Sequence, residues 1–200
     1  MNNFNSRIAR ESTQLSSNPT SGKSSLRATL LTLRNGMSPA ARDTATAAIC
    51  AHLLELQQRH AWTTLAVFWP IRGEADLTAA YLHMASSGMQ LALPVVTAAQ
   101  APLRFAAWTP GQLMTRDAFG VSIPSTPQQW VTPDAMLIPC VGFTATRIRL
   151  GYGGGFYDRT LAILPDVIAL GIAFDGSRTA FDPESHDVPL QGVLTESGLH

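Results

Sequence analysis

The chain has 200 residues with 14 basic and 14 acidic side chains, so its formal net charge is zero. A protein that coats DNA or RNA normally needs a basic excess, as does a polybasic membrane anchor, and this balance speaks against both classes. Apolar residues make up 46% of the chain, but no apolar run approaches the ~20 residues of a membrane-spanning helix. We therefore expect a globular protein with no nucleic-acid partner and no membrane partner.

The first 22 residues are polar and rich in Ser and Asn, and they lack the apolar stretch of a secretory signal. We expect residues 1–22 to form a disordered extension and residues 23–200 to form one domain. Cys50 and Cys140 have neither a metal-binding spacing nor a disulfide framework. Two buried thiols in a reduced, cytoplasmic protein are therefore expected.

Two helices are predicted next. Residues 23–35 carry leucines at spacings of four and three, from Leu26 to Leu33, which is typical of an amphipathic helix. Ser38 and Pro39 then suit the N-cap and the first position of a second helix, whose buried stripe is rich in Ala and Leu.

The rest of the chain alternates between strand and helix patterns. Strands are expected over 64–69, 90–93, 103–108, 135–138 and 167–174, and helices over 76–85 and 155–164. Proline follows three of these strands, at Pro70, Pro94 and Pro139, and is expected to end each one. Strands that alternate with helices indicate an α/β domain with a largely parallel sheet, in which ligands bind beyond the carboxyl ends of the strands.

A glycine-rich segment follows the strand expected at 135–138. Four glycines and two arginines crowd into RLGYGGGFYDR at 149–159. Glycines let backbone N–H groups approach phosphate oxygens, and a helix that starts near Gly155 would direct its positive end at the same anion. Asp158 does not suit direct contact with phosphate, but it suits a Mg²⁺ ion that makes that contact. The segment therefore predicts phosphate binding.

Neither standard nucleotide-binding motif matches this loop. A Walker A motif needs a lysine that the loop lacks, and the dinucleotide fingerprint G-x-G-x-x-G finds Phe156 at its last place. Gly22-Lys23-Ser24 imitates the end of a Walker A motif, but Ser17 stands where the first glycine is required. We reject both motifs.

Several segments together resemble the 5-formyltetrahydrofolate cyclo-ligase (5,10-methenyltetrahydrofolate synthetase) family. They are, in chain order, Lys23-x-x-x-Arg27, FWPIRGEADL at 68–77, LPVV at 93–96, DAMLIPCVGF at 134–143, RLGYGGGFYDR at 149–159 and ESHDVPL at 184–190. The resemblance covers roughly residues 21–198, and the glycine segment is its specific part. It implies a three-layer α/β/α fold and a single catalytic domain. It also implies ATP- and Mg²⁺-dependent cyclisation of 5-formyltetrahydrofolate to 5,10-methenyltetrahydrofolate, with release of ADP and phosphate.

The resemblance also implies a set of site residues. The ATP-binding positions map to Lys23, Arg27, Arg149, Leu150, Gly151, Tyr152, Gly153, Gly154, Gly155, Phe156 and Tyr157. The folate-binding positions map to Trp69, Glu74, Tyr152 and Phe156. Lys23 and Arg149 would act in catalysis by neutralising charge during phosphoryl transfer. Asp158 and Asp187 would hold the Mg²⁺ ion. Each residue also has an ordinary interpretation: Lys23 and Arg27 would share an exposed helix face, and Trp69 would belong to the core.

The sequence departs from the family's usual pattern at a few positions. Phe156 stands where a tyrosine is usual, Arg147 and Cys140 stand where glycines are common, and Ile123 stands near a position that often holds a glutamate. These changes affect individual contacts more than the assignment.

Two other functions fit parts of the sequence. A sugar-phosphate isomerase-like enzyme on a related scaffold would share the phosphate-binding loop without needing ATP. A non-catalytic folate- or nucleotide-binding protein would keep the fold without the reaction. In each case we expect a monomer or a homodimer.

Overall fold

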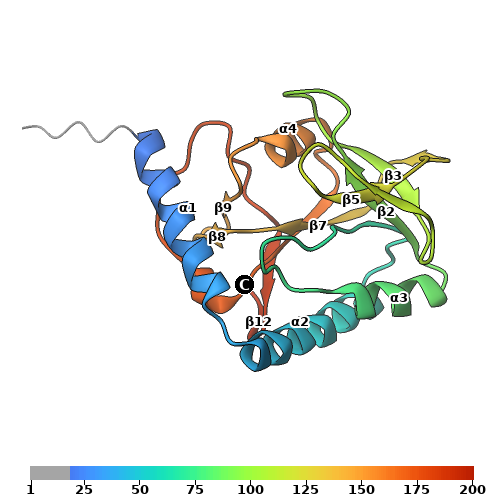
Figure 1. The fold of residues 1–200 in the computed structure, drawn as a ribbon, viewed down its shortest axis with the longest axis horizontal. Helices are drawn as coiled ribbons and strands as arrows, with labels where there is room; N and C mark the ends of the chain where they lie inside the picture. Colours follow the sequence, from blue (N-terminus) through green and yellow to red (C-terminus); the bar gives the residue numbers. More distant parts are fainter. Residues whose placement is uncertain (1–18) are drawn as a thin grey trace, which may run out of the picture.

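The computed structural model describes residues 19–200, so residues 1–18 of the predicted extension lie outside the described residues. A large sheet forms the centre of this part of the chain, and helices cover both of its faces (Figure 1). This arrangement confirms the predicted three-layer α/β/α fold. None of the helices in residues 19–200 combines the length and the apolar character that a bilayer crossing requires.

Eight strands make up the central sheet within the described residues. They are β1 (Thr64–Ala66), β2 (Gln90–Val95), β3 (Arg104–Trp108), β6 (Trp130–Val131), β7 (Ala135–Pro139), β10 (Ile168–Ile172), β11 (Gly192–Thr195) and β12 (Gly198–Leu199). Their order in the sheet is β12-β11-β10-β7-β1-β2-β3-β6. The five neighbours from β11 to β2 are parallel, and the outer strands pair antiparallel to them. The prediction of a largely parallel sheet is therefore confirmed.

Two small hairpins and the helices complete the fold. The hairpins are β4 (Met114–Arg116) with β5 (Ser122–Pro124), and β8 (Gly142–Phe143) with β9 (Arg149–Leu150). The helices are α1 (Pro19–Asn35), α2 (Pro39–Arg59), α3 (Thr78–Ser86) and α4 (Phe156–Ile163), with a 3-10 turn η1 (Asp175–Ser177).

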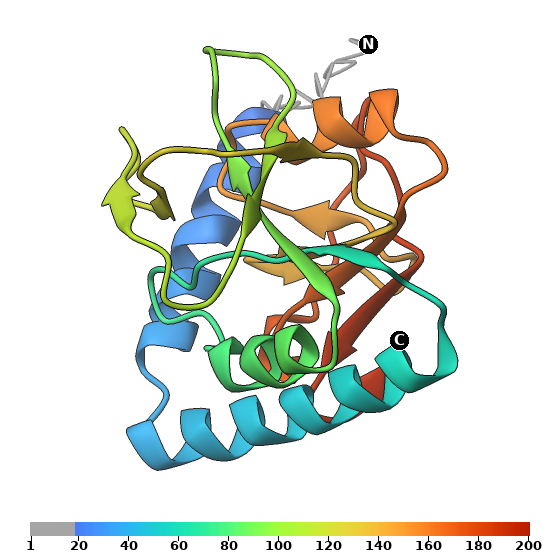
Figure 2. The same cartoon turned by 90° about the vertical axis from the view of Figure 1, so that its right-hand side faces the viewer.

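The core lies on both faces of the sheet because successive strand residues point to opposite sides. In β1, Leu65 packs with residues of α2 and α3, whereas Ala66 packs with residues of α4. Figures 1 and 2 show these helices on the two sides of the sheet. Helix α2 contributes Ile49 and Leu53 to the first layer, and α4 contributes Leu161 to the second. Since both faces are covered, the parallel strands read as continuous apolar runs in the sequence.

Helix α1 lies outside these two layers. It begins at Pro19, four positions before the predicted start. It stands beside the small β8–β9 hairpin (Figure 1), where Leu30 packs with Val141 and Leu150. Helix α2 begins as predicted, because Pro39 is its first residue and the Ser38 side chain accepts a 3.2 Å hydrogen bond from the Ala41 N–H.

The predicted ends of two strands were wrong. β2 continues through Pro94 to Val95, and β1 ends at Ala66 rather than at Trp69. The Ala92 carbonyl accepts a hydrogen bond from the Val67 N–H, and the nitrogen of Pro94 faces the same side of β2. Proline has no N–H to donate there, so Pro94 ends the ladder with β1 and leaves the ladder with β3 intact.

Candidate active site

Four parts of the chain meet beyond the carboxyl ends of β1, β7 and β10. The loop after β1 carries Glu74, the loop after β9 carries the glycines at 151–155, and the segment after η1 carries Asp187. Helix α1 makes side-chain contacts with the second and third of these parts. The site therefore lies where the parallel sheet predicts it.

Lys23 forms an ion pair with two carboxylates from the segment before β11. Its Nζ lies 2.9 Å from Asp187 Oδ2 and 3.0 Å from Glu184 Oε1, and only 8% of the residue is exposed. Burial opposes ionisation of both Lys23 and Asp187, but the two carboxylates raise the pKa of Lys23 above its usual value. The Glu184 N–H and Lys23 lower the pKa of Asp187 below its usual value. The two side chains therefore stabilise each other as ions.

Arg27 holds the glycine loop from one side. Its Nε donates a 2.8 Å hydrogen bond to the carbonyl of Gly151. The loop ends at Gly155, whose φ of +66° is left-handed and which caps α4 without a side-chain hydrogen bond. The first N–H groups of α4 therefore have no capping side chain, which is the geometry that favours an anion.

Arg149 forms a buried ion pair across the same loop. Its Nη2 lies 2.8 Å from Asp158 Oδ1, and 7% of its side chain is exposed. The guanidinium also lies over the ring of Tyr157, 5.4 Å from its centroid. A Cβ atom on residue 151 would lie 2.0 Å from Arg149 Nη1. A side chain at 151 would therefore force the Arg149 guanidinium to shift.

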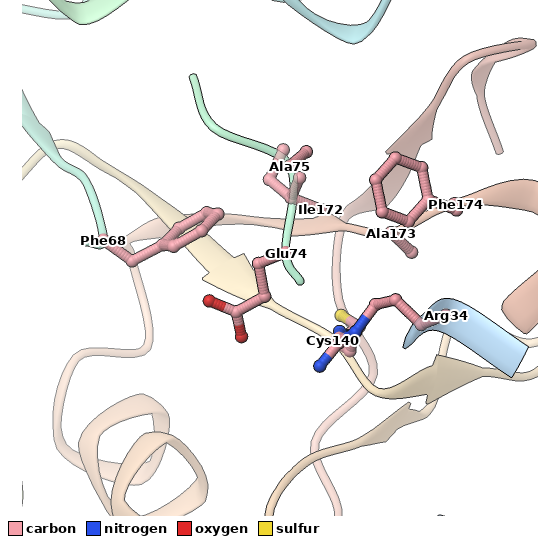
Figure 3. A pocket seen from close by; sticks show the side chains of 8 residues that line it. All are labelled: Arg34, Phe68, Glu74, Ala75, Cys140, Ile172, Ala173 and Phe174. Atoms are coloured by element: carbon pink, nitrogen blue, oxygen red, sulfur yellow. The ribbon is translucent and has the colours of Figure 1, made fainter. Parts of the chain in front are cut away.

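Glu74, Tyr152 and Arg34 form a hydrogen-bonded chain. The Tyr152 hydroxyl donates to Glu74 Oε1 at 2.5 Å and accepts from Arg34 Nη2 at 2.5 Å. The second carboxylate oxygen, Oε2, accepts a 2.9 Å hydrogen bond from the Ile71 N–H. Figure 3 shows Glu74 and Arg34 entering one small pocket, which Cys140 also lines. Burial raises the pKa of Glu74 above its usual value despite Tyr152 and the nearby arginines.

Aromatic side chains at two of the predicted site positions, Phe156 and Trp69, pack against other aromatic rings. Phe156, the first residue of α4, packs edge-on against Phe119 with ring centroids 5.6 Å apart. Phe119 is 60% exposed and comes from the turn between β4 and β5. Trp69 is half-buried and packs against Trp108 at 5.9 Å.

Sequence reasoning missed Arg34, Glu184 and Phe119. Arg34 lies eleven residues after Lys23 and seven after Arg27, which puts all three on one face of a helix. That spacing was a usable signal. Phe119 lies in a hairpin turn, where no periodicity marks a position as part of a site. Glu184 also lies in a loop, but it opens the family segment at 184–190, which was a usable signal.

The family model for 5-formyltetrahydrofolate cyclo-ligases matches residues 19–196. The chain belongs to this family. The predicted resemblance is confirmed, and with it the prediction of a ligase rather than of a sugar-phosphate isomerase-like enzyme.

Three relatives that carry the family's name align with this chain over most of their length. The 5-formyltetrahydrofolate cyclo-ligase of Mycolicibacterium smegmatis is 31% identical over 186 residues, which is 86% of this chain and 93% of the relative. The protein of the same name from Haemophilus influenzae is 27% identical, over 88% of this chain and 98% of the relative. The protein of the same name from Escherichia coli K12 is 32% identical, over 67% of this chain and 78% of the relative.

Solved structures of the family share the fold. The NMR structure of Aquifex aeolicus 5,10-methenyltetrahydrofolate synthetase matches with a TM-score of 0.75 and 26% identity, over 88% of this chain and 91% of that chain. The 5,10-methenyltetrahydrofolate synthetase from Mycoplasma pneumoniae matches with a TM-score of 0.72 and 24% identity, over 87% of this chain and 98% of that chain.

One departure from the cyclo-ligase pattern has a visible structural effect. Arg147 stands where a glycine is common, and its φ is +62°, a left-handed value that glycine adopts freely. For other residues this conformation costs roughly 1–2 kcal/mol. Two hydrogen bonds offset the strain: Arg147 Nε donates to the Leu190 carbonyl at 3.1 Å, and the Leu190 N–H donates to the Arg147 carbonyl at 3.0 Å. The backbone conformation is thus kept without the glycine.

The predicted metal ligands lie in separate ion pairs. Asp187 Oδ2 is engaged by Lys23, and Asp158 Oδ1 by Arg149. Among residues 19–200 no group of three or more side chains of metal-binding type comes together. Asp158 Oδ2 accepts no hydrogen bond from the described residues, so one carboxylate oxygen is left for a hard cation such as Mg²⁺. The donor chemistry fits Mg²⁺ through a few protein oxygens, with phosphate and water as the remaining ligands.

Proposed function

We propose that this chain catalyses the ATP- and Mg²⁺-dependent ring closure of 5-formyltetrahydrofolate to 5,10-methenyltetrahydrofolate, with ADP and phosphate as the other products. One observation carries the proposal. Helix α1 contacts both the segment of Asp187 and the glycine loop, and the same loop contacts Glu74 through Tyr152. The groups assigned to ATP, to the metal and to folate thus form one connected site.

The chemistry requires activation of an amide. The formyl carbon on N5 resists attack by N10 because the nitrogen lone pair is delocalised into the carbonyl group. Transfer of the γ-phosphoryl group of ATP to the formyl oxygen gives an iminium phosphate and ADP. The N10 amine then forms the new C–N bond and gives up its proton to water, and the C–O bond to phosphate breaks, so that phosphate leaves. The protein's main task is to hold the reactants in line and to neutralise charge.

The basic residues of the site suit the triphosphate. In this proposal Lys23 and Arg27 bind ATP from α1, and Arg149 and the open N-terminus of α4 bind it from the glycine loop. Lysine acts as a point charge and arginine as a planar fork, and both are common phosphate ligands. Lys23 and Arg149 would stabilise the charge that moves during the transfer.

The two ion pairs suggest how the metal and the nucleotide enter together. Asp158 and Asp187 would hold the Mg²⁺ ion, which when bound neutralises charge on the phosphates. In the described structure each carboxylate faces one of the cations assigned to ATP. Binding of the magnesium nucleotide would therefore exchange two internal ion pairs for carboxylate–metal and cation–phosphate contacts, with little unpaired charge at any stage.

The folate end of the site would contain the remaining residues. Glu74 would contact the folate, and Trp69, Tyr152 and Phe156 would lie beside the ring system. Trp69 also packs into the core, so its contribution to binding and its contribution to stability overlap. Both cysteines are free, with Cys140 buried and Cys50 half-buried, and reduced thiols support a cytoplasmic location for the reaction.

One assay tests the proposal. Purified protein is incubated with 5-formyltetrahydrofolate, Mg²⁺ and ATP while the absorbance of the methenyl product is followed, with ATP omitted as the control. We expect the methenyl product to accumulate only when ATP is present. Binding of folate or ATP without turnover would favour the non-catalytic alternative.

A further inference from the structure

The third basic residue on the inner face of α1, Arg34, has no role in the assignments above. Only 8% of it is exposed, although it carries a permanent charge. Its guanidinium lines the pocket that Glu74 also lines, and Figure 3 shows it coming from the end of α1. Burying such a group is unfavourable unless its donors are used.

The contacts of Arg34 fix the direction of one hydrogen bond. Its Nη1 donates to the Cys140 carbonyl at 3.2 Å, and its Nη2 donates to the Tyr152 hydroxyl. A phenol has one proton, and guanidinium can only donate. The Tyr152 hydroxyl therefore accepts from Arg34 and must give its own proton to Glu74, as the 2.5 Å contact with Oε1 shows.

A second arginine fixes the two main-chain segments that carry this chain of contacts. Arg42 Nη2 donates to the carbonyl of Arg34 at 2.9 Å, and Arg42 Nη1 donates to the carbonyl of Gly73 at 2.7 Å. Gly73 has a φ of +73°, and a Cβ atom there would lie 2.2 Å from Arg42 Nη1. The end of α1 and the turn before Glu74 are thus tied together.

We propose that Arg34 is a positioning residue for the folate end of the site: it orients the Tyr152 hydroxyl so that Glu74 presents its carboxylate to the folate in one fixed geometry. The inference rests on the proposed contact between Glu74 and folate. Arg72 also faces this group, with its guanidinium 5.3 Å from the centroid of the Tyr152 ring. The Arg34 guanidinium also lies over this ring, 5.8 Å from its centroid, but among the described residues only Arg34 donates to the hydroxyl and so sets the direction of its proton.

The test compares the KM values of the two substrates. Arg34→Met removes the donors at similar length, and we expect it to raise the KM for 5-formyltetrahydrofolate roughly 10- to 100-fold, the usual effect of losing a charged hydrogen bond. The KM for ATP should change by less than about twofold. Arg34→Lys keeps one donor and should give a smaller rise. Equal rises in both KM values would overturn the proposal.

A double-substitution cycle adds a readout that a purely structural role would not move. Arg34→Met and Tyr152→Phe break the same chain of contacts. The folate KM of the double variant should therefore be no higher than that of the more affected single variant. Additive effects would overturn the proposal. If Arg34→Met does not fold, the same cycle is run with Arg34→Lys.

Two further variants keep the outcomes distinct. Arg59→Met, on the exposed surface of α2, is the matched control and should leave both KM values unchanged. Glu74→Gln tests the proposed contact between Glu74 and folate. An unchanged folate KM in this variant would refute both that contact and the role of Arg34. A raised folate KM in Glu74→Gln beside unchanged values in both Arg34 variants would overturn the role of Arg34 alone.

Discussion

Lys23 and Asp187 lie 164 positions apart in the sequence and form a 2.9 Å ion pair in the fold. The contact joins the first helix to the segment before β11, so it closes the site from both ends of the domain. Glu184 adds a second carboxylate at 3.0 Å. This relationship makes Lys23 a stability residue as well as a proposed ATP ligand, and the two roles are separable by experiment.

The contribution of this pair to stability should depend on pH. The folded-state pKa of Asp187 is lowered, so its contribution is present above its ordinary value of 3.8 and is lost as the pH falls through the lowered folded value. The folded-state pKa of Lys23 is raised, so its contribution is present below 10.5 and is lost as the pH rises through the raised value. We expect Lys23→Ala to lose roughly 3 kcal/mol at neutral pH.

The measurement is the free energy of unfolding of wild type and Lys23→Ala across the pH range. The difference between the two proteins should shrink at both acidic and alkaline extremes. A difference that stays constant into strong acid would contradict the role of Asp187 in the pair. The exposed pair Arg59–Glu55 supplies the control, since Arg59→Ala should change stability little at any pH.

Lys23→Ala should also separate the two substrates. Because Lys23 lies with the groups assigned to ATP, and Glu74 lies in a different loop, we expect the KM for ATP to rise more than the KM for 5-formyltetrahydrofolate. Steady-state kinetics with each substrate varied in turn gives both values. A larger rise for the folate would count against ATP binding by the start of α1.

Asp158→Asn should abolish ATP-dependent ring closure while the fold survives. Asparagine keeps an oxygen that accepts a hydrogen bond from Arg149, so the neighbouring guanidinium is not left without a partner. The lost charge removes the proposed hold on Mg²⁺. Turnover is measured over a Mg²⁺ titration, beside a circular dichroism spectrum as the check on folding. Mg²⁺-dependent turnover at the wild-type level would refute the metal assignment.

Gly151→Ala should reduce turnover strongly without unfolding the domain. The added methyl group would overlap Arg149 Nη1, so the guanidinium must shift from its present position beside Asp158. The matched control is Gly176→Ala, where nothing lies within 4 Å of the added Cβ atom and the backbone is not left-handed. We expect a loss of at least about tenfold in kcat/KM for Gly151→Ala, since displacing a transition-state donor commonly costs 10²–10³. Equal activity in the two variants would show that Arg149 needs no fixed position.

Glu74→Gln should lower activity and leave stability equal or higher at neutral pH. Burial raises the pKa of Glu74, so the ionised carboxylate opposes folding there, and that penalty grows as the pH rises through the raised folded value. Thermal unfolding midpoints of both proteins, measured at neutral and at mildly acidic pH, test this. A variant that is less stable at neutral pH, by a margin that acid does not reduce, would contradict it.

The sequence predicted the secondary structure well where apolar residues recur with a regular spacing, and poorly where they do not. The buried runs at 64–69 and 135–138 were found because both faces of the sheet are covered. β8 and β9 are two residues each, and β4 and β5 are three, so no period develops in them. Pro94 was misread as a strand end because the sequence does not show on which side a strand has a partner.

The site divides in the same way. The glycine loop and Lys23-x-x-x-Arg27 have a fixed spacing and could be found from the sequence. Arg34 had a helical spacing that pointed to it, but no family segment contained it. Glu184 opens the family segment at 184–190, but only Asp187 was singled out there. Phe119 contacts Phe156 only through tertiary folding, since its neighbours in the sequence belong to a hairpin turn.

Helix α1 has one small apolar cluster, centred on Leu30, and its polar attachments are made by its basic side chains. Salt screens the solvent-facing part of these attachments, at the Glu184 carboxylate, whereas it does not weaken the two apolar layers on the sheet. The attachment of this helix is therefore a property of the solution as well as of the sequence. Its amides should exchange with solvent faster at high ionic strength, while those of the central strands stay protected. The part of the domain that we propose binds the nucleotide is therefore also the part whose docking depends on ionic strength.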